Sequence, residues 1–434
     1  MNSDDELALA MLLEEKAEAD AAAAQHSAML NHLLHLYRLE ARPRRGGSKP
    51  GRMKGKERQR ASGYATLYAD YFADRPLNEP KVFRRRFRMS RKLFMRLVVA
   101  VREFDPYFIA KKDAVGVLGF SSIQKCTAAM RLLAYGAPAD ATDDYLRISE
   151  SCAIESLYRF CKAVVAVFGE NYLRSPNAED TARIMAQNAA RGFPGMLGSI
   201  DCMHWEWKNC PFAWQGMYKS RKGSCSIVLE AVADHDLWIW HAFFGMAGSH
   251  NDINMLNFSS LFSKLLEGHS PPCNYTINNH DYTKGYYLAD GIYPRWSTFV
   301  KTISNPVAGK NSHFATEQEA ARKDVERAFG VLQARFAIVR YPALTWSKDQ
   351  MWEVMTACVI LHNMIIESER ENPVAADPQP YYRQGPLADV DHQIPAQFYA
   401  YLQTRQEIRD AASHEQLQAD LIEHLWARKG NANV

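Results

Sequence analysis

The sequence contains no long uninterrupted apolar run, which argues against a helical membrane protein. No segment reaches the roughly 18 consecutive apolar residues that a membrane-spanning helix needs. The chain begins Met-Asn-Ser-Asp-Asp-Glu, whereas a secretory signal begins with basic residues followed by an apolar stretch. We therefore expect no membrane span and no secretory leader.

Paired metal-binding cysteines are also missing. The eight cysteines include no Cys-x-x-Cys pair, and no His-x-x-x-His motif accompanies them. A structural zinc site is therefore not expected, and the cysteines are typical of reduced thiols in a nuclear or cytosolic protein. Hydrophobic residues make up 47% of the 434 residues, enough to bury the cores of two or three domains.

Charge is distributed unevenly near the N-terminus, and residues 1–62 are assigned to an acidic helical segment followed by a basic flexible linker. Residues 4–40 carry eight acids against two bases and are rich in Ala and Leu. They predict either a partner-binding helix or a solvated one. Residues 41–60 carry nine bases against one acid, with four Gly and two Pro. This run suits nuclear import, phosphate contact or a solvated linker.

Residues 63–188 have a helical pattern and are predicted to form a DNA-binding domain. Serine caps, apolar spacing and a Gly-Ala-Pro break indicate helices over 121–135, 139–146 and 152–168. Three helices joined by tight turns resemble a helix-turn-helix unit, although any small helical domain shows this pattern. The cations Arg84, Arg85 and Arg86 favour contact with a DNA backbone.

The pattern changes after a Pro- and Gly-rich boundary near 175–195, and residues 189–370 are predicted to form a nuclease domain. Residues 371–434 are assigned to a C-terminal extension. Strand and helix signals follow one another in the order of a ribonuclease H-like core, a mixed sheet flanked by helices in an α/β fold. The expected strands are 196–205, 225–234, 237–245 and 285–291, and the expected helices are 251–266, 316–336 and 349–367.

Three acids fall at positions that suit metal-dependent cleavage of a phosphodiester. Asp201 ends the first strand, Asp290 ends the fourth, and Glu326 lies in the middle of a later helix. In-line attack on a phosphodiester develops charge on both the attacking and the leaving oxygen, and two metal ions about 4 Å apart stabilise both. Mg²⁺ or Mn²⁺ prefers such oxygen ligands.

Four segments resemble the catalytic core of PIF/Harbinger transposases, a family of DDE enzymes. They are Gly-Ser-Ile-Asp-Cys-Met-His-Trp (198–205), Met-Ala-Gly-Ser-His-Asn-Asp-Ile-Asn (246–254), Asp-Val-Glu-Arg-Ala-Phe-Gly (324–330) and Leu-His-Asn-Met (361–364). The resemblance implies that Asp201, Asp290 and Glu326 form the metal-holding triad. It also implies DNA as a partner, a separate Myb/SANT-like DNA-binding protein, and the possibility of a homo-oligomer.

The wider superfamily has a helix pattern Tyr-x2-Arg-x3-Glu-x6-Lys, which this chain follows only in part. Arg322 and Glu326 fit the pattern, but Glu319 occupies the tyrosine position and Gln333 the lysine position. These departures put a DNA-positioning contact in doubt rather than the metal ligand. Arg335 is a candidate to replace the missing cation.

Several candidate residues keep a structural interpretation beside the functional one. Asp201 could cap a strand end, Asp290 could be a turn residue, and Glu326 could pair with Arg322 one helical turn back. Asp252 could be a fourth carboxylate or a helix N-cap. His204 could line the cleft or pack.

An aromatic and basic stretch follows the first strand and is predicted to be irregular. It could contact DNA or stack on an extruded base, although most of the aromatic residues here are expected in the core. Its residues are Trp214, Tyr218, Lys219, Arg221 and Lys222.

The function predicted from the sequence is that of a metal-dependent DNA endonuclease or transposase acting at transposon-derived ends, with the nucleus as the expected compartment and the cytoplasm as a second one. The alternative is a domesticated, catalytically silent protein that binds DNA or a chromatin complex. Intact acids favour the first hypothesis without excluding the second.

Overall fold

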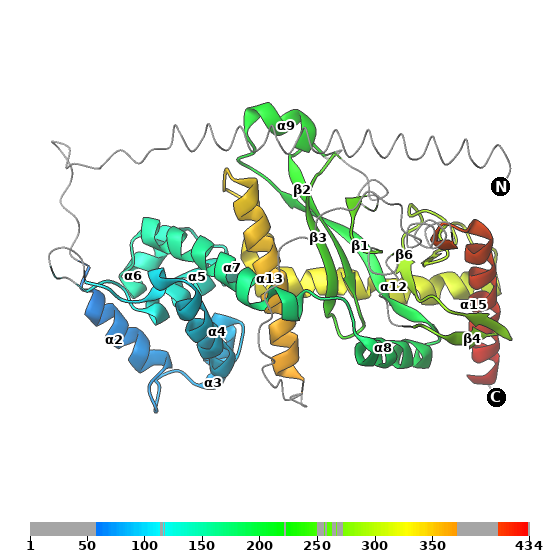
Figure 1. Ribbon diagram of the computed structural model, residues 1–434, viewed down its shortest axis with the longest axis horizontal. Helices are drawn as coiled ribbons and strands as arrows, with labels where there is room; N and C mark the ends of the chain where they lie inside the picture. The colour runs from blue at the N-terminus through cyan, green and yellow to red at the C-terminus, as the bar shows by residue number, and fades with distance from the viewer. Residues whose placement is uncertain are drawn as a thin grey trace, which may run out of the picture. The chain divides into compact units, whose positions relative to one another are not determined.

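A computed structural model of the chain describes residues 58–112, 116, 118–220, 223–249, 256, 258–262, 266, 272–370 and 407–432. Figure 1 shows a helical part at one end, a twisted sheet, and long helices packed along and across that sheet. None of the helices in the described ranges is both long and apolar enough to cross a bilayer. Residues 1–57 of the predicted acidic segment and basic linker lie outside the described residues. The end of the predicted linker is instead helical, since helix α2 spans Arg60–Tyr71.

The first part of the described chain is helical, as its apolar spacing predicts. The predicted helices over 121–135 and 152–168 are confirmed, and the predicted 139–146 segment divides into a 3-10 turn and a short α-helix. The elements are α2 (Arg60–Tyr71), α3 (Pro80–Phe87), α4 (Arg91–Phe104), η1 (Pro106–Phe108), α5 (Ser122–Tyr135), η2 (Ala139–Thr142), α6 (Asp143–Leu146), α7 (Glu150–Tyr172) and α8 (Ala178–Ala190).

Local capping explains where α5 begins and ends. The Ser121 side chain accepts a hydrogen bond from the Gln124 backbone N–H, and Gln124 Oε1 accepts one from the Ser121 backbone N–H. This capping box satisfies two backbone donors that the first helical turn leaves open. Gly136 then takes a left-handed conformation, with φ of 59°, and ends the helix.

The sheet has five strands in the order β3-β2-β1-β6-β7. The first three strands along the chain pair antiparallel, and β6 and β7 continue the sheet in parallel from the other edge of β1. The strands are β1 (Met196–Glu206), β2 (Ser226–Ala233), β3 (Ile239–Ala247), β6 (Tyr286–Ala289) and β7 (Phe299–Lys301), with a separate hairpin of β4 (Tyr275–Ile277) and β5 (His280–Tyr282).

The four predicted strands are therefore confirmed, whereas the stretch after the first strand differs from its prediction. Residues expected to be irregular form a short helix, α9 (Phe212–Tyr218). Tyr218 is buried on Trp207, with ring centroids 5.2 Å apart, while Trp214 keeps 43% of its surface exposed. Packing of Tyr218 onto the core thus gives this stretch a regular conformation that local propensity does not indicate.

Long helices cover the sheet and close the fold. They are α12 (Lys310–Arg335), α13 (Lys348–Glu369) and α15 (Ala411–Ala432), with a 3-10 turn η3 (Ala337–Val339) between the first two. Helix α12 packs on β1 and β2, α15 packs on α12, and α13 lies between α7 and β3. One hydrophobic cluster runs from Phe94 and Phe160 in the helical part through α13 to Leu229 and Ile239 in the sheet.

The Leu-His-Asn-Met motif lies in α13 and holds these parts together. Asn363 is fully buried, and its side chain accepts a hydrogen bond from Ile239 N at 2.9 Å and donates to the oxygens of Ile239 and Tyr172 at 2.8 Å. His362, also buried, donates from Nε2 to the Leu237 carbonyl at 2.8 Å. The motif therefore acts as a scaffold that joins β3 to α7.

Candidate active site

The parallel pairing of β1 with β6 brings Asp201 and Asp290 together at one edge, where β6 ends. Asp201 does not end its strand as predicted, because pairing with β2 continues β1 to Glu206. Ser199 pairs with Leu288 in the register of these strands. Two residues further along each strand are Asp201 and Asp290, and neighbouring parallel strands carry in-register side chains on the same face. Two carboxylates far apart in the sequence are thus placed side by side by backbone pairing.

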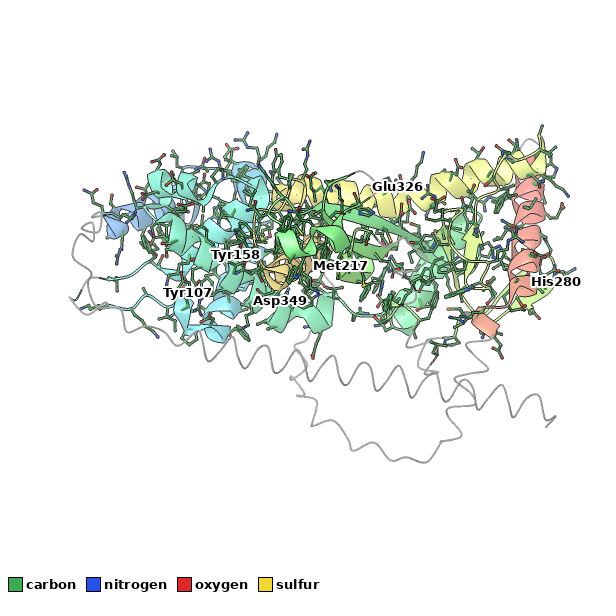
Figure 2. The ribbon with its side chains drawn as sticks, turned by 90° about the horizontal axis from the view of Figure 1, so that it is seen from above. Tyr107, Tyr158, Met217, His280, Glu326 and Asp349 are labelled. Atoms are coloured by element: carbon green, nitrogen blue, oxygen red, sulfur yellow. The ribbon has the colours of Figure 1, made fainter. Side chains whose placement is uncertain are left out.

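Helix α12 contributes the third acid, Glu326, which Figure 2 labels on this helix. The Val325 N–H donates to Ser199 Oγ at 3.0 Å, so the helix is joined to β1 directly beside both Glu326 and Asp201. About two turns earlier on the helix, Gln318 Nε2 donates to the carbonyls of Ala289 and Val300 at 3.2 and 3.1 Å. Two buried polar side chains therefore fix the helix against the strands that carry the acids.

Arg322 lies between two of the three acids. Its guanidinium is 3.4 Å from Asp201 Oδ2 and 3.1 Å from Glu326 Oε1. The predicted pair between Glu326 and Arg322 is confirmed, and the same arginine also reaches across to the sheet. Its Nε is buried without a hydrogen-bond partner among the described residues. Arg322 thus offsets the repulsion between the two carboxylates that face it.

Asp290 starts a turn as well as belonging to this edge. Its Oδ1 accepts a hydrogen bond from Gly291 N at 2.5 Å, and its carbonyl accepts one from Tyr293 N at 3.2 Å. Lys301, at the end of the neighbouring strand β7, is half-buried. Burial lowers the pKa of the Lys301 ammonium, and the negative charge of Asp290 opposes this decrease. Lys301 and Asp290 are therefore opposite charges that attract each other.

The arrangement gathers hard oxygen donors on three elements beside two cationic side chains. Such oxygens are the ligands that Mg²⁺ and Mn²⁺ take in proteins. Within the described ranges, however, no three His, Cys, Asp or Glu side chains approach closely enough to hold a metal ion together.

The auxiliary candidates are only partly brought to this edge. His204 lies three residues after Asp201 in a regular strand, so its side chain is on the opposite face of the sheet, where Nδ1 is 3.0 Å from Ser226 Oγ. Asp252 lies outside the described residues, as do Arg221 and Lys222. Lys219 is exposed at the end of α9.

Arg335 is not brought to the acids. It follows Glu326 by nine residues, or two and a half helical turns, and so lies on the opposite side of α12. There its Nη2 donates to Glu369 at 2.7 Å. Gln333, at the expected lysine position, lies on the same side as Glu326 and contacts Met203 Sδ at 3.2 Å. The missing cation is therefore not supplied by Arg335 in this arrangement.

The arginines of α3 lie in the helical part. Arg84 and Arg85 are exposed, whereas Arg86 is half-buried and lines a small hollow with Arg131 of α5. Arg84 and Arg85 can therefore contact a polyanion that approaches from solvent. The second arginine of the hollow, Arg131, is one of several further cations that the sequence places in this helical region.

Two further residues at the candidate site were missed by sequence reasoning. Ser199 directly precedes Ile-Asp201 in the motif, and strand alternation places it on the same face as Asp201, so its role could have been inferred. Gln318 gives no such signal, because its contacts are with backbone carbonyls of strands that the sequence does not show to be adjacent.

Comparison with known proteins relates the sequence of this chain to a family. Residues 170–373 match the family described as plant transposon protein, and residues 63–102 match a domain of unknown function. No solved structure matches the chain.

Three relatives illustrate the breadth of the similarity. "Protein ALP1-like" of Arabidopsis thaliana is 23% identical over 319 residues, which cover 70% of this chain and 75% of that protein. "Putative nuclease HARBI1" of Homo sapiens is 22% identical over 259 residues, covering 57% of this chain and 70% of that protein. The Bos taurus protein of the same name is 24% identical over 209 residues, covering 46% of this chain and 56% of its own length.

Proposed function

Residues 170–373 belong to a transposase-derived family of the Harbinger type, and from that premise we propose that the chain is a metal-dependent DNA endonuclease or transposase that hydrolyses phosphodiester bonds at transposon-derived ends. The observation that carries this proposal is the placement of Asp201, Asp290 and Glu326 on three adjoining elements, with Arg322 bridging Asp201 and Glu326. The three acids come from a central strand, the end of its parallel neighbour and a helix joined to that strand.

The topology supports a ribonuclease H-like core for this domain. The family resemblance implies three antiparallel strands followed by parallel ones. The strand order β3-β2-β1-β6-β7 agrees with this, since β1, β2 and β3 pair antiparallel and β6 and β7 are parallel to β1. A helical region precedes this core and presents Arg84 and Arg85 to solvent. We assign DNA binding and a helix-turn-helix-like role to residues 63–188 as part of the same proposal.

The donor set fits a divalent ion such as Mg²⁺ or Mn²⁺. Asp201, Asp290 and Glu326 would hold it, because all three offer carboxylate oxygens and none is tied to a second acid. When bound, the ion would supply charge stabilisation to the oxygens of the reacting phosphodiester and lower the pKa of water. The cationic Arg322 pairs with two of these acids, which supports the proposal that this position favours positive charge.

The chain's own residues have positioning tasks in this proposal. Ser199 and Gln318 keep the helix in register with the strand ends, so that the acids do not separate when the substrate approaches. Arg322 pairs with Asp201 and Glu326 until another cation replaces it. No nucleophilic Ser, Tyr or Cys is required, because water attacks the phosphorus directly.

Partners and compartment complete the proposal. The substrate is DNA, a Myb/SANT-like protein is proposed to supply part of the DNA recognition, and a homo-oligomer would allow two ends to be held together. The basic run at 41–60 supports placement in the nucleus.

The test is cleavage of end-containing DNA with Mg²⁺ or Mn²⁺ by the wild type and by Asp201→Asn, Asp290→Asn and Glu326→Gln. Each substitution removes a charge with little change in shape, and each should abolish nicking. Glu317→Gln is the matched control, since Glu317 and Glu326 lie on the same helix with side chains 43% and 42% exposed. Nine residues separate them, so Glu317 lies on the other side of α12. Cleavage by the three variants at the wild-type rate would contradict the catalytic assignment.

A domesticated, catalytically silent DNA- or chromatin-complex-binding protein is the second candidate. Its support is the departure at Gln333, which packs on Met203 where the superfamily pattern has a lysine. This candidate predicts DNA binding that is unchanged by Asp201→Asn and no cleavage with either metal. Metal-dependent nicking by the wild type, but not by the three acid variants, would exclude this candidate.

A further inference from the structure

A hollow of about 200 Å³ lies in the helical part, away from the candidate active site. It opens between α3, α5 and the turn that follows α5. Two arginines, Arg86 and Arg131, share it with Tyr135, Thr142 and apolar residues of that turn. The volume is several times the roughly 30 Å³ that one water molecule occupies in the liquid. The hollow therefore has room for a small polyatomic group.

Among the arginines of the described ranges, Arg131 is the one with two buried guanidinium nitrogens, Nε and Nη2, that lack a hydrogen-bond partner. The guanidinium lies 4.4 Å from the centroid of the Tyr145 ring, and it forms no ion pair there. Buried donors of a charged group are costly to leave unsatisfied, so such an arrangement points to a ligand that accepts hydrogen bonds.

The charges around this guanidinium indicate the sign of that ligand. Burial lowers the pKa of Arg131 from its usual value, and the positive charge of Arg86 acts in the same direction. The Asp70 carboxylate is engaged by the hydroxyl of Tyr145, on whose ring Arg131 lies. Two cations thus share a hollow in which no carboxylate pairs with Arg131, and an anion would relieve both the repulsion and the unsatisfied donors.

We propose that the hollow formed by Arg86 and Arg131 binds a phosphate group of the DNA backbone. This inference rests on the proposed function, since it takes DNA to be the substrate. Arg84 and Arg85 are exposed on the same helix as Arg86, and so they continue the positive surface from the hollow to solvent. A planar guanidinium with free donors matches two phosphate oxygens at once, which makes arginine suited to this contact.

The experiment measures binding of a random-sequence duplex oligonucleotide by the full chain in EDTA, over a range of salt concentrations. Arg131→Met is the principal variant, because methionine keeps an apolar stem of similar reach. Losing one phosphate contact should weaken binding about tenfold and reduce the slope of log K against log salt by about 1. Arg102→Gln is the control, since it removes an exposed cation of α4 that lies outside the hollow and should leave the slope unchanged.

Thermal unfolding of the same variants separates ligand binding from a structural role. Replacing a buried, unpaired charge with an apolar side chain should leave the melting temperature unchanged or raise it. An unchanged salt slope in Arg131→Met, or a fall in its melting temperature by several degrees, would overturn the proposal. If Arg131→Met did not fold, Arg86→Gln would carry the same binding test, because Arg86 is only half-buried.

Two further arms identify the ligand and its relation to catalysis. Inorganic phosphate that raised the melting temperature of the wild type but not of Arg131→Met, with an unchanged DNA slope, would assign the hollow to free phosphate and overturn the DNA assignment. Cleavage is assayed separately with Mg²⁺. If Arg131→Met had the wild-type salt slope while the wild type cleaved DNA, only the phosphate-binding proposal for the hollow would be refuted. If Arg131→Met had a reduced salt slope while the wild type did not cleave DNA, only the nuclease function would be refuted.

Discussion

Replacing Arg322 with glutamine removes the cation that lies between Asp201 and Glu326. The pair with Glu326 is an exposed contact one helical turn apart, and such pairs contribute about 0.3–0.5 kcal/mol. The contact with Asp201 is more enclosed, with the side chains 16% and 23% exposed, and we take about 1–2 kcal/mol for it. Without metal, the variant should therefore unfold roughly 3 °C below the wild type.

The same interactions oppose entry of a metal ion, because a bound ion and Arg322 compete for the same carboxylates. Removing about 1.4–2 kcal/mol of competition should tighten the binding of Mn²⁺ by about 10- to 30-fold. Titration calorimetry with Mn²⁺ at constant ionic strength measures this change. Arg327→Gln is the control, since Arg327 pairs with Asp324 instead. Unchanged or weaker Mn²⁺ binding by Arg322→Gln would refute the reasoning.

Three further substitutions test how the scaffold supports the site. Ser199→Ala removes the acceptor for Val325 N–H and should cost about 1 kcal/mol, with kcat for DNA cleavage falling more than KM; equal stability and kcat would argue against a positioning role. Asn363→Leu leaves three buried backbone groups unpaired and should lower stability in denaturant titration by on the order of 3 kcal/mol, and a smaller loss than Ser199→Ala would contradict this. Burial lowers the pKa of His362 to about 3, so the unfolded state binds the proton more tightly than the folded state. The free energy of unfolding should therefore decrease by up to about 1.4 kcal/mol per pH unit as the pH falls from 6.5 towards 3. The His362→Gln variant should show a smaller decrease over the same pH range.

Strand and helix positions were largely predictable because each follows from a local pattern. The apolar run that ends at Asp201 and the amphipathic spacing around Glu326 indicated β1 and α12 correctly, although α12 begins at Lys310 rather than at the predicted 316. The three-residue strand β7 was missed, since a segment of that length carries no periodicity. Its place in the sheet depends on pairing with β6.

The three acids remain a prediction, and the contacts around them could be foreseen only in part. Alternation along a strand is enough to place His204 on the opposite face from Asp201, and helical geometry alone removes Arg335 from the side of Glu326. The contact of Arg322 with Asp201 could not be foreseen, because it joins a helix to a strand 121 residues away in the sequence. Arg131 is recognisable in the sequence only as one of several cations of the helical region, since the sequence does not show whether a carboxylate meets it.

The continuous hydrophobic cluster that joins the helical part to the sheet has a consequence for where DNA is cut. Helix α13 packs against both α7 and β3, and Asn363 bonds to backbone atoms of Tyr172 and Ile239 on either side. The hollow at Arg131 and the edge at Asp201 are consequently built on one framework rather than on two parts that move independently. A phosphate held at Arg131 would lie a constant number of nucleotides from the scissile bond, so cleavage should occur at a fixed offset from the bound segment whatever the base sequence between them.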